Sequence, residues 1–177
     1  MLKSASDAKV KSVDLLLGMI TAAVHDVGHR GVSNNFLIKF SDPLAITYND
    51  DHVQENFHTA EAFRVAAEAE GCNIFELCSK ETYGGEGTKN GLETQDILKG
   101  VMMCADIGHG AKQFEVHIKW SMKVVEEFYS QGDREREANT SVSPLCNRCG
   151  EKESFYDGQS GFLRYLVEPL FEVMAPR

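Results

Sequence analysis

The apolar residues of this chain recur at helical spacing, and no stretch keeps the two-residue alternation of a half-buried strand. The periodic segments are residues 13–27, 53–70, 92–107, 114–131 and 158–174. The chain has 177 residues, 42% of them apolar, which is enough material for a core without disulfides. The sequence therefore predicts an all-α fold in a single domain over residues 1–177.

Glycine, proline and polar residues are expected to separate these helices. Pro43 marks residues 41–50 as a break, and the glycine-rich residues 83–91 are expected to form a loop. Gly71 and Gly132 are each expected to end the helix that precedes them. The expected result is a set of helices joined by short polar connections.

The first and last helices have features of their own. Residues 13–27 are hydrophobic almost all round, so we expect this helix to be central rather than superficial. Residues 158–174 contain Pro169, which should kink or interrupt the last helix.

The charge and the cysteines restrict the partners and the setting of the protein. The net charge is −9, which argues against a nucleic-acid partner because such binding rests on basic patches. An anionic substrate would need a local metal ion or basic cluster to overcome the general repulsion. No segment reaches the ~18 uninterrupted apolar residues of a membrane span. The five cysteines are irregularly spaced and no signal peptide is evident, so we expect a reducing, cytoplasmic setting.

The stretch HDVGHRGVSNN directly follows the first apolar segment. His25 and His29 are four residues apart, so they would lie one above the other if the helix continued, and Asp26 is adjacent. A lone histidine on an apolar helix is more often a satisfied core residue than a ligand. Imidazole and carboxylate together, however, suit Zn²⁺, Mg²⁺ or Mn²⁺, and His29 and Asn34 are suitably polar to orient such ligands. The pattern indicates a metal site at the end of this helix.

Two further clusters fit the same interpretation. Glu55 and His58 are three residues apart and face the same way on the expected helix, although a solvated carboxylate and a surface histidine would look the same. Asp106 follows the apolar run VMMCA, which would carry its carboxylate into the interior. A buried carboxylate is costly unless it is paired or metal-bound, so Asp106 is the natural partner of His25 and Asp26.

Two other motifs carry little weight. Cys146 and Cys149 form a CxxC pair, but a structural zinc site needs two more ligands at compatible spacing, and the sequence offers no second pair. The glycine-rich residues 83–91 do not match a phosphate-binding spacing.

The order of the motifs is recognisable as a whole. The chain carries HDVGHRGVSNNF, YNDDHVQENFHTAEAF, MMCADIGH, KWSMKVVEEFYSQGDRERE, SPLCNR and QSGFLRYLVEPLF. From about Asp14 to the C-terminus these blocks resemble the catalytic domain of class I cyclic nucleotide phosphodiesterases, and HDxxHxGxxN is matched at every specified position. The resemblance implies an HD-type helical catalytic fold with two divalent metal ions, Zn²⁺ and Mg²⁺ or Mn²⁺. It also implies hydrolysis of 3′,5′-cyclic AMP or cyclic GMP to the 5′-monophosphate by a metal-activated hydroxide, in cyclic-nucleotide signalling.

The resemblance assigns roles to particular residues. It makes His25, Asp26 and Asp106 metal ligands, with Asp26 bridging both metals. It places a catalytic group around the reacting water and phosphate, consisting of His29, Asn34, Glu55 and His58.

The same resemblance outlines a substrate-binding pocket. Gln159 aligns with the glutamine that hydrogen-bonds the purine edge, and Phe162 with the aromatic residue that stacks on the base. Val124 would face Phe162 across the base. His109 and His117 fall on positions that line the pocket.

The chain departs from the family pattern in ways that leave alternatives open. The family carries an HNxxHA segment that supplies a general acid and one metal ligand, whereas residues 1–24 here contain no histidine. The acid alone is worth typically ~10²-fold to 10⁴-fold in rate. The family's second aspartate is Gly28 here, and a usual proline is Gly110.

We therefore expect a catalytic domain that is incomplete at its N-terminus. The first alternative is an inactive module that binds cyclic nucleotide or a partner, and a second is another HD-type metallohydrolase. The sequence does not decide whether cyclic AMP or cyclic GMP is the preferred substrate. It also leaves the oligomeric state open, with a homodimer as one option.

Overall fold

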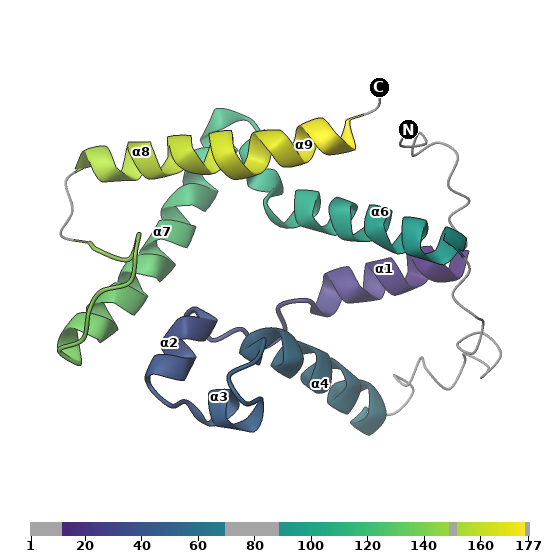
Figure 1. Cartoon of the computed structure of the whole chain (residues 1–177). Coiled ribbons are helices and arrows are strands. Elements are labelled where there is room, and N and C mark those ends of the chain that lie inside the picture. Colours follow the sequence, from purple (N-terminus) through teal and green to yellow (C-terminus); the bar gives the residue numbers. More distant parts are fainter. Residues whose placement is uncertain (1–11, 70–88, 149–151, 176–177) are drawn as a thin grey trace. The chain divides into compact units, whose positions relative to one another are not determined.

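The computed structural model describes residues 12–69, 89–148 and 152–175 (Figure 1). Among these residues there are helices and connecting segments but no strand, which confirms the all-α class. The chain divides into two compact units, Met1–Leu98 and Lys99–Arg177. Whether they act together as the single domain expected from the sequence remains a prediction.

The first unit contains four helices among its described residues before α6. They are α1 (Ser12–Val24), α2 (Asn34–Lys39), α3 (Pro43–Thr47) and α4 (Val53–Glu68). Helix α6 (Lys89–Asp106) begins in this unit and continues into the second. The second unit goes on with a 3₁₀ turn (Gly108–Ala111), α7 (Phe114–Glu137), α8 (Lys152–Phe162), a π-helical segment (Leu163–Val167) and α9 (Glu168–Met174).

The core of the first unit lies where α2, α3 and the start of α4 meet. Its buried side chains are those of Val32, Phe36, Leu37, Ala45 and Val53, with Ile38, Leu44 and Tyr48 packed against them. The sequence analysis did not predict α2 and α3, because neither helix is long enough to show an apolar face at helical spacing. Each is marked instead by an N-cap residue. The Ser33 side chain accepts the Phe36 N–H at 3.2 Å, and the Asp42 side chain accepts the Leu44 N–H at 2.9 Å.

The prediction of a break over residues 41–50 is wrong for its middle part, where α3 lies. Pro43 occupies the first turn of α3, a position where a missing N–H costs nothing because that group would have no intrahelical partner. Proline therefore starts a helix here instead of excluding one.

The first helix is shorter and more exposed than expected. It ends at Val24 rather than at residue 27, because the Val27 N–H closes a tight turn on the Val24 carbonyl at 3.1 Å. None of its side chains is buried, and Leu15, Leu16 and Met19 are exposed. The expectation of a central helix is wrong, since every described side chain of this helix is exposed or half-buried.

The later helices begin earlier or end later than their patterns predicted. Helix α6 starts at Lys89, inside the expected loop 83–91, while residues 83–88 and Gly71 lie outside the described residues. Helix α8 starts at Lys152 rather than at residue 158. The α-helix is interrupted before Pro169, as expected: a π-helical segment lies between α8 and α9, which otherwise continue along one line (Figure 1). Proline has no backbone N–H to donate to the carbonyl four residues earlier, and a π-helical turn accommodates the loss of that hydrogen bond.

Gly132 does not end a helix, because α7 continues to Glu137. A Cβ atom at Gly132 would lie 1.8 Å from the Cys146 carbonyl oxygen, so the glycine lets the connection after α7 approach the helix backbone. The sequence signal was real, but it marked a close backbone contact rather than a helix stop.

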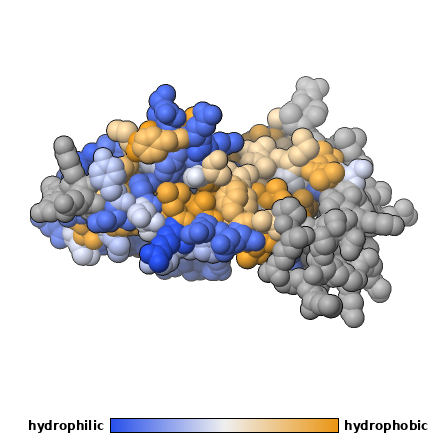
Figure 2. Space-filling view, turned by 90° about the horizontal axis from the view of Figure 1, so that it is seen from above, coloured by the Kyte–Doolittle hydropathy of each residue, from blue (hydrophilic) through white to orange (hydrophobic). Residues whose placement is uncertain are grey.

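The second unit also leaves large apolar side chains in contact with solvent. Helix α7 exposes Phe114, Trp120 and Met122, and the segment from α8 to α9 exposes Tyr165 and Val173. The view from above shows orange apolar surface next to blue polar surface (Figure 2). Within the described residues no helix is long and apolar enough to cross a membrane.

We expect Gly132→Ala to destabilise the second unit by several kcal/mol, because its Cβ meets rigid backbone that must move. Gly161→Ala is the matched control on α8: its Cβ would meet only Tyr165 Cδ2 at 3.9 Å, so it should gain ~0.5–1 kcal/mol from helix propensity. Urea unfolding followed by the fluorescence of Trp120, the chain's one tryptophan, measures both. Equal midpoints for the two variants would contradict the close contact.

Candidate functional site

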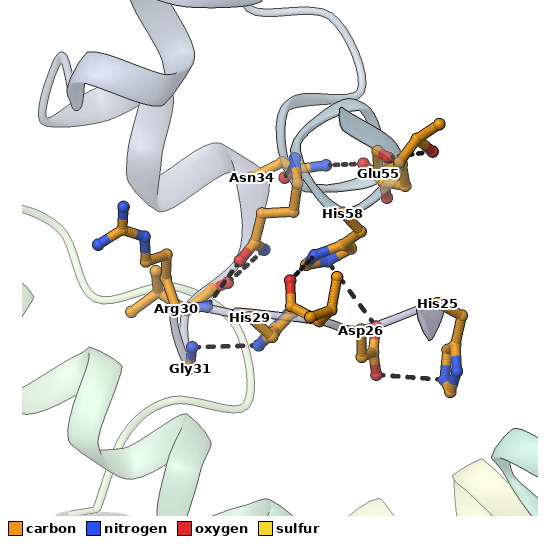
Figure 3. Close-up of polar contacts among 12 residues, drawn as sticks. His25, Asp26, His29, Arg30, Gly31, Asn34, Glu55 and His58 are labelled. Carbon is orange, nitrogen blue, oxygen red and sulfur yellow. Dashed lines mark hydrogen bonds and ion pairs between the residues drawn. The ribbon is translucent and has the colours of Figure 1, made fainter. Parts of the chain in front are cut away.

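The turn after α1 places His25 and Asp26 beside His58 of α4 (Figure 3). The Asp26 carboxylate lies 3.3 Å from His25 Nε2 and 3.9 Å from His58 Nε2. His58 is 4% exposed, whereas His25 and Asp26 are exposed. Asp26 is thus flanked by two imidazoles at an open position on the first unit.

Backbone carbonyls fix the protonation of both rings. His25 Nδ1 lies 2.9 Å from the Ala22 carbonyl oxygen, and His58 Nδ1 lies 2.8 Å from that of Val27. A carbonyl only accepts, so each Nδ1 must carry the hydrogen, and in the neutral ring Nε2 then has a lone pair. Both lone pairs face the Asp26 carboxylate. Lone pairs and a carboxylate gathered in this way are stabilised by protonation or by a cation, so this donor set fits a divalent metal ion.

His29 lies beside these residues but is bonded differently. Its Nδ1 accepts the Gly31 N–H at 3.1 Å, and its ring stacks on His58 with centroids 5.7 Å apart (Figure 3). Its Nε2 therefore carries the hydrogen in the neutral ring. His29 can donate a hydrogen bond from Nε2, whereas His25 and His58 offer lone pairs there.

Asn34 and Glu55, which the family resemblance placed in one group, are joined by a hydrogen bond. Asn34 Nδ2 donates to Glu55 Oε2 at 2.8 Å, and Asn34 Oδ1 accepts the backbone N–H of Gln54 at 3.0 Å. The Asn34 hydrogen bond is the main reason why the pKa of the Glu55 carboxyl is lowered, with smaller contributions from His52 and His58. Glu55 is therefore an ionised carboxylate held at a defined place.

Gln54 is the residue of this network that the sequence reasoning missed. Its side chain is buried, donates to the Val32 carbonyl at 2.8 Å and accepts the Arg30 N–H at 3.1 Å. It joins the turn that follows His29 to the start of α4. No sequence signal singled it out, because a glutamine at a helix start is usually solvated.

Gly28 explains one departure from the family pattern. Its φ is +72°, and a Cβ atom there would lie 2.9 Å from the Phe57 ring. The left-handed turn and the close aromatic ring both favour glycine over aspartate at this position.

A cavity of about 340 Å³ in the second unit collects most of the predicted base-binding residues. Four residues of the expected substrate-binding group line it, His109, Val124, Gln159 and Phe162. The rest of the lining was not named from the sequence and consists of Val125, Phe128, Tyr129, Leu145, Asn147, Phe155 and Gly158. The Gln159 Oε1 atom is buried with no hydrogen-bond partner among the described residues. A buried carbonyl of this kind is costly, so the cavity is suited to a ligand that brings an N–H donor.

His117 is not among the residues that line this cavity. It is 8% exposed and lies behind His109, with 3.1 Å between the two Nδ1 atoms. Burial, and to a smaller extent His117, lower the pKa of His109. The Phe162 ring lies parallel to His109, with centroids 5.6 Å apart. His117 therefore reaches the pocket only through His109.

The connection after α7 supplies part of the cavity wall and is anchored by a buried carboxylate. Glu135 is fully buried and accepts the backbone N–H and the hydroxyl of Ser143, each at 2.6 Å. Leu145 and Asn147 follow and line the cavity. Burial and the nearby Glu135 raise the pKa of the Cys146 thiol, which is consistent with an unreactive structural cysteine.

Asp106 is the last residue of α6 and belongs to the second unit. Its side chain is exposed, which contradicts the expectation that the preceding apolar run would bury it. The run is one face of a helix that ends there, so the carboxylate lies at the helix terminus. Its partnership with His25 and Asp26 remains a prediction.

The first unit thus carries a histidine–aspartate cluster suited to a metal ion, and the second an apolar cavity with an unsatisfied amide. Together with the all-helical fold, they define the class of helical HD-type metal-dependent hydrolase domains. The family model of 3′,5′-cyclic nucleotide phosphodiesterases matches residues 1–85 and 85–176. The chain belongs to this family, whose members are metal-dependent hydrolases.

Individual relatives agree with this assignment. The 3′,5′-cyclic-AMP phosphodiesterases 4C of Mus musculus and Rattus norvegicus are each 30% identical to the chain over 209 residues and match 97% of it. The chain spans only 30% and 38% of those two proteins. The crystal structure of the phosphodiesterase domain of the RhoPDE fusion protein from the choanoflagellate Salpingoeca rosetta superposes with a TM-score of 0.80 at 25% identity. That match covers 96% of this chain and 63% of that one.

We expect Asn34→Ala to raise the pKa of Glu55 toward its ordinary value of 4.5, since the largest cause of the lowering is removed. A lowered carboxyl pKa contributes stability above 4.5 that is lost as the pH falls through the folded-state value. The variant should therefore lose less stability than the parent as the pH falls below 4.5. A carbon-detected NMR titration of the Glu55 carboxyl measures the shift directly. Asn35→Ala is the neighbouring control, and an equal Glu55 pKa in all three proteins would contradict the assignment.

Proposed function

We propose that this chain is a cyclic nucleotide phosphodiesterase unit that hydrolyses 3′,5′-cyclic nucleotides to 5′-monophosphates. The observation that carries the proposal is the Asp26 carboxylate between two imidazoles whose Nε2 lone pairs face it. Family membership supports the same reaction, and the relatives named above act on cyclic AMP.

In this proposal the metal ligands are His25, Asp26 and Asp106. Zn²⁺ with Mg²⁺ or Mn²⁺ would supply Lewis acidity toward the phosphate and lower the pKa of a water nucleophile. The Nε2 lone pair of His58 and the Asp26 carboxylate would both face a bound cation, and the Nδ1–H bond of His58 to the Val27 carbonyl keeps the ring from turning.

The remaining residues of the first unit would orient water and phosphate. His29 offers an Nε2–H donor to a phosphate oxygen or to the leaving oxygen, because its Nδ1 is occupied by the Gly31 N–H. Glu55 is an ionised acceptor that Asn34 holds in place, suited to accept a proton of the attacking water. These roles need no histidine from residues 1–24.

In the second unit, the cavity would bind the base. Gln159 Oε1 accepts a donor of the purine edge, which satisfies a buried carbonyl that otherwise has no partner in the described part of the chain. Phe162 supplies the stacking ring, and Val124 contributes an apolar wall.

A second candidate function is a module that binds cyclic nucleotide without hydrolysing it. The observation that favours it is the cavity with the unsatisfied Gln159, which lies in the second unit and is complete without the His25–Asp26 cluster. Cytoplasmic location and dimerisation remain predictions under either candidate.

Hydrolysis is tested by incubating the chain with cyclic AMP or cyclic GMP and Mn²⁺ or Mg²⁺ and following release of the 5′-monophosphate. We expect turnover that falls by ~10²-fold or more in Asp26→Asn and Asp106→Ala, since each removes a ligand. Asp50→Asn is the control, because this exposed residue has a positive φ that suits asparagine. Binding of cyclic nucleotide by the folded chain without turnover, with either metal, would favour the second candidate.

Base binding is tested by calorimetric titration with both cyclic nucleotides. Phe162→Ala should weaken binding about 5-fold to 160-fold, since stacking of a base on an aromatic ring is worth ~1–3 kcal/mol. Gln159→Ala should weaken it by a smaller factor, about 2-fold to 10-fold. Tyr165→Ala removes an exposed ring that does not line the cavity and should have no effect. Unchanged affinity in Phe162→Ala would place the base elsewhere.

A further inference from the structure

Arg148, in the connection after α7, is bonded back to that helix by every nitrogen of its guanidinium group. Its Nη1 and Nη2 donate to the two carboxylate oxygens of Glu126, each at 2.8 Å, and its Nε donates to Asp133 Oδ2 at 2.9 Å. Glu126 and Asp133 are about two helical turns apart on α7. One side chain of the connection is therefore fastened to α7 at two levels.

Arg136 extends this set of contacts to the wall of the base-binding cavity. Its Nη1 donates to the second carboxylate oxygen of Asp133 at 2.8 Å, and its Nη2 donates to Asn147 Oδ1 at 3.0 Å. Asn147 lines the cavity. We call Glu126, Asp133, Arg136 and Arg148 the clasp.

The clasp differs from an ordinary surface ion pair in its geometry. The side chains of Arg148, Glu126 and Asp133 are 39%, 64% and 36% exposed, and single pairs at such positions contribute little to stability. A guanidinium that bonds both oxygens of one carboxylate and a second carboxylate as well fixes orientation, because the fork is rigid and planar. The Arg148 hydrogen bonds are the main reason why the pKa values of Glu126 and Asp133 are lowered. The clasp thus serves to position the connection rather than to stabilise the fold.

The connection is fastened on both sides of the residues that line the cavity. Ser143 is bonded to the buried Glu135, and Arg148 is bonded to the clasp. Leu145 lies between them with a φ of 65°, a conformation that bulky residues rarely adopt and that persists only where the surroundings impose it. Leu145 is 70% exposed, so burial of its own side chain does not impose that conformation. The two fastenings must do so.

Arg148 also contacts the α7 side of the cavity from behind. Its guanidinium carbon lies 5.2 Å from the centroid of the Tyr129 ring, and Tyr129 lines the cavity. Arg148 itself is not among the lining residues. It therefore touches the structure of the wall on both sides without meeting a ligand.

We propose that Arg148 is a positioning residue of the base-binding cavity, which holds Leu145, Asn147 and Tyr129 through the clasp in the arrangement that receives a base. This inference rests on the proposed function, because it takes the cavity to be the base site. Nucleotide affinity then depends on carboxylates of α7 that do not line the cavity.

The first test observes the wall directly, without a ligand. Arg148→Met keeps an unbranched side chain of similar length and removes the donors, and the full chain is labelled with ¹³C at the leucine methyl groups for NMR. We expect the Leu145 methyl signals to shift and their order parameter to fall, while those of Leu163 stay the same. Arg164→Met is the matched control, because it removes the same charge at an exposed position where the guanidinium lies over Tyr165. Unchanged Leu145 signals in Arg148→Met would overturn the proposal.

The second test measures affinity by calorimetric titration with cyclic AMP and cyclic GMP in the absence of metal. Arg148→Met should weaken the binding of both by about 10-fold, because the nucleotide must then order the wall itself. Arg164→Met should bind both as the parent does.

A comparison of variants tests whether Arg148 acts through the clasp. Glu126→Gln combined with Asp133→Asn should cause the same loss of affinity as Arg148→Met, and joining all three changes should add nothing, because these groups act as a unit. The carboxylate changes make the chain less negative, so a long-range charge effect would instead strengthen binding of an anionic nucleotide. Stronger binding by the carboxylate variant, or losses that add, would overturn the proposal.

The outcomes separate this inference from the proposed function. If the nucleotides bind the parent and Arg148→Met equally well, the inference fails and the proposed function stands. If neither nucleotide binds the folded parent chain, both fail. If Arg148→Met does not fold, Glu126→Gln, which leaves the Asp133 bond in place, takes its place in both measurements. Unchanged Leu145 signals and affinities in that variant would then overturn the inference.

Discussion

The histidine–aspartate cluster of the first unit depends on the way an irregular segment satisfies its backbone hydrogen-bonding groups. Residues 25–32 follow α1 without a helix of their own, so their N–H and C=O groups need partners elsewhere. Local turns bond the Val27 and His29 N–H groups. Helix α4 supplies three more partners: His58 donates to the Val27 carbonyl, and Gln54 bonds both the Arg30 N–H and the Val32 carbonyl. The same bonds fix His58 as an Nδ1–H tautomer and place its lone pair toward Asp26. The same hydrogen bonds therefore satisfy the backbone and orient the histidine–aspartate cluster, and a change at Gln54 would affect both.

The second unit uses the same principle with different groups. The connection after α7 approaches the helix where Gly132 has no side chain, and Glu135 accepts two bonds from Ser143 in a fully buried position. A buried carboxylate is tolerated only because these donors compensate for its desolvation. The result is that Leu145, with a positive φ of 65°, and Asn147 form part of the cavity wall. The hydrogen bonds that hold this wall lie outside the cavity and do not involve Gln159. Gln159 Oε1 therefore stays available for a hydrogen bond from a ligand.

Sequence reasoning identified the features that repeat along a helix or that stand in a motif. The long helices and the all-α class follow from the spacing of apolar residues, and the structure agrees. The family resemblance grouped Asn34 with Glu55, and the structure joins these two side chains by a hydrogen bond. Features that depend on a partner far along the chain were not predictable in this way. Gly132 looked like a helix stop because the contact with Cys146 cannot be read from local sequence. Gln54 gave no signal. The family resemblance placed His117 among the pocket-lining residues, but its position behind His109 depends on tertiary packing and could not be read from the sequence.

Electrostatics separates the two steps of the proposed reaction. The chain carries a net charge of −9, and Asp26, Glu55 and Asp106 add carboxylates where the proposal places an anionic phosphate. Without a cation, these carboxylates repel the phosphate, since a like charge a few ångströms away is unfavourable by about 1–4 kcal/mol at effective dielectric constants of 80 to 20. The base-binding cavity has no such charge, because its lining consists of apolar and aromatic residues, amides, a glycine and the half-buried His109. Base recognition should therefore be nearly independent of metal, whereas phosphate binding should require it. A chain that keeps the cavity but lacks part of the metal ligation would lose turnover before it loses affinity.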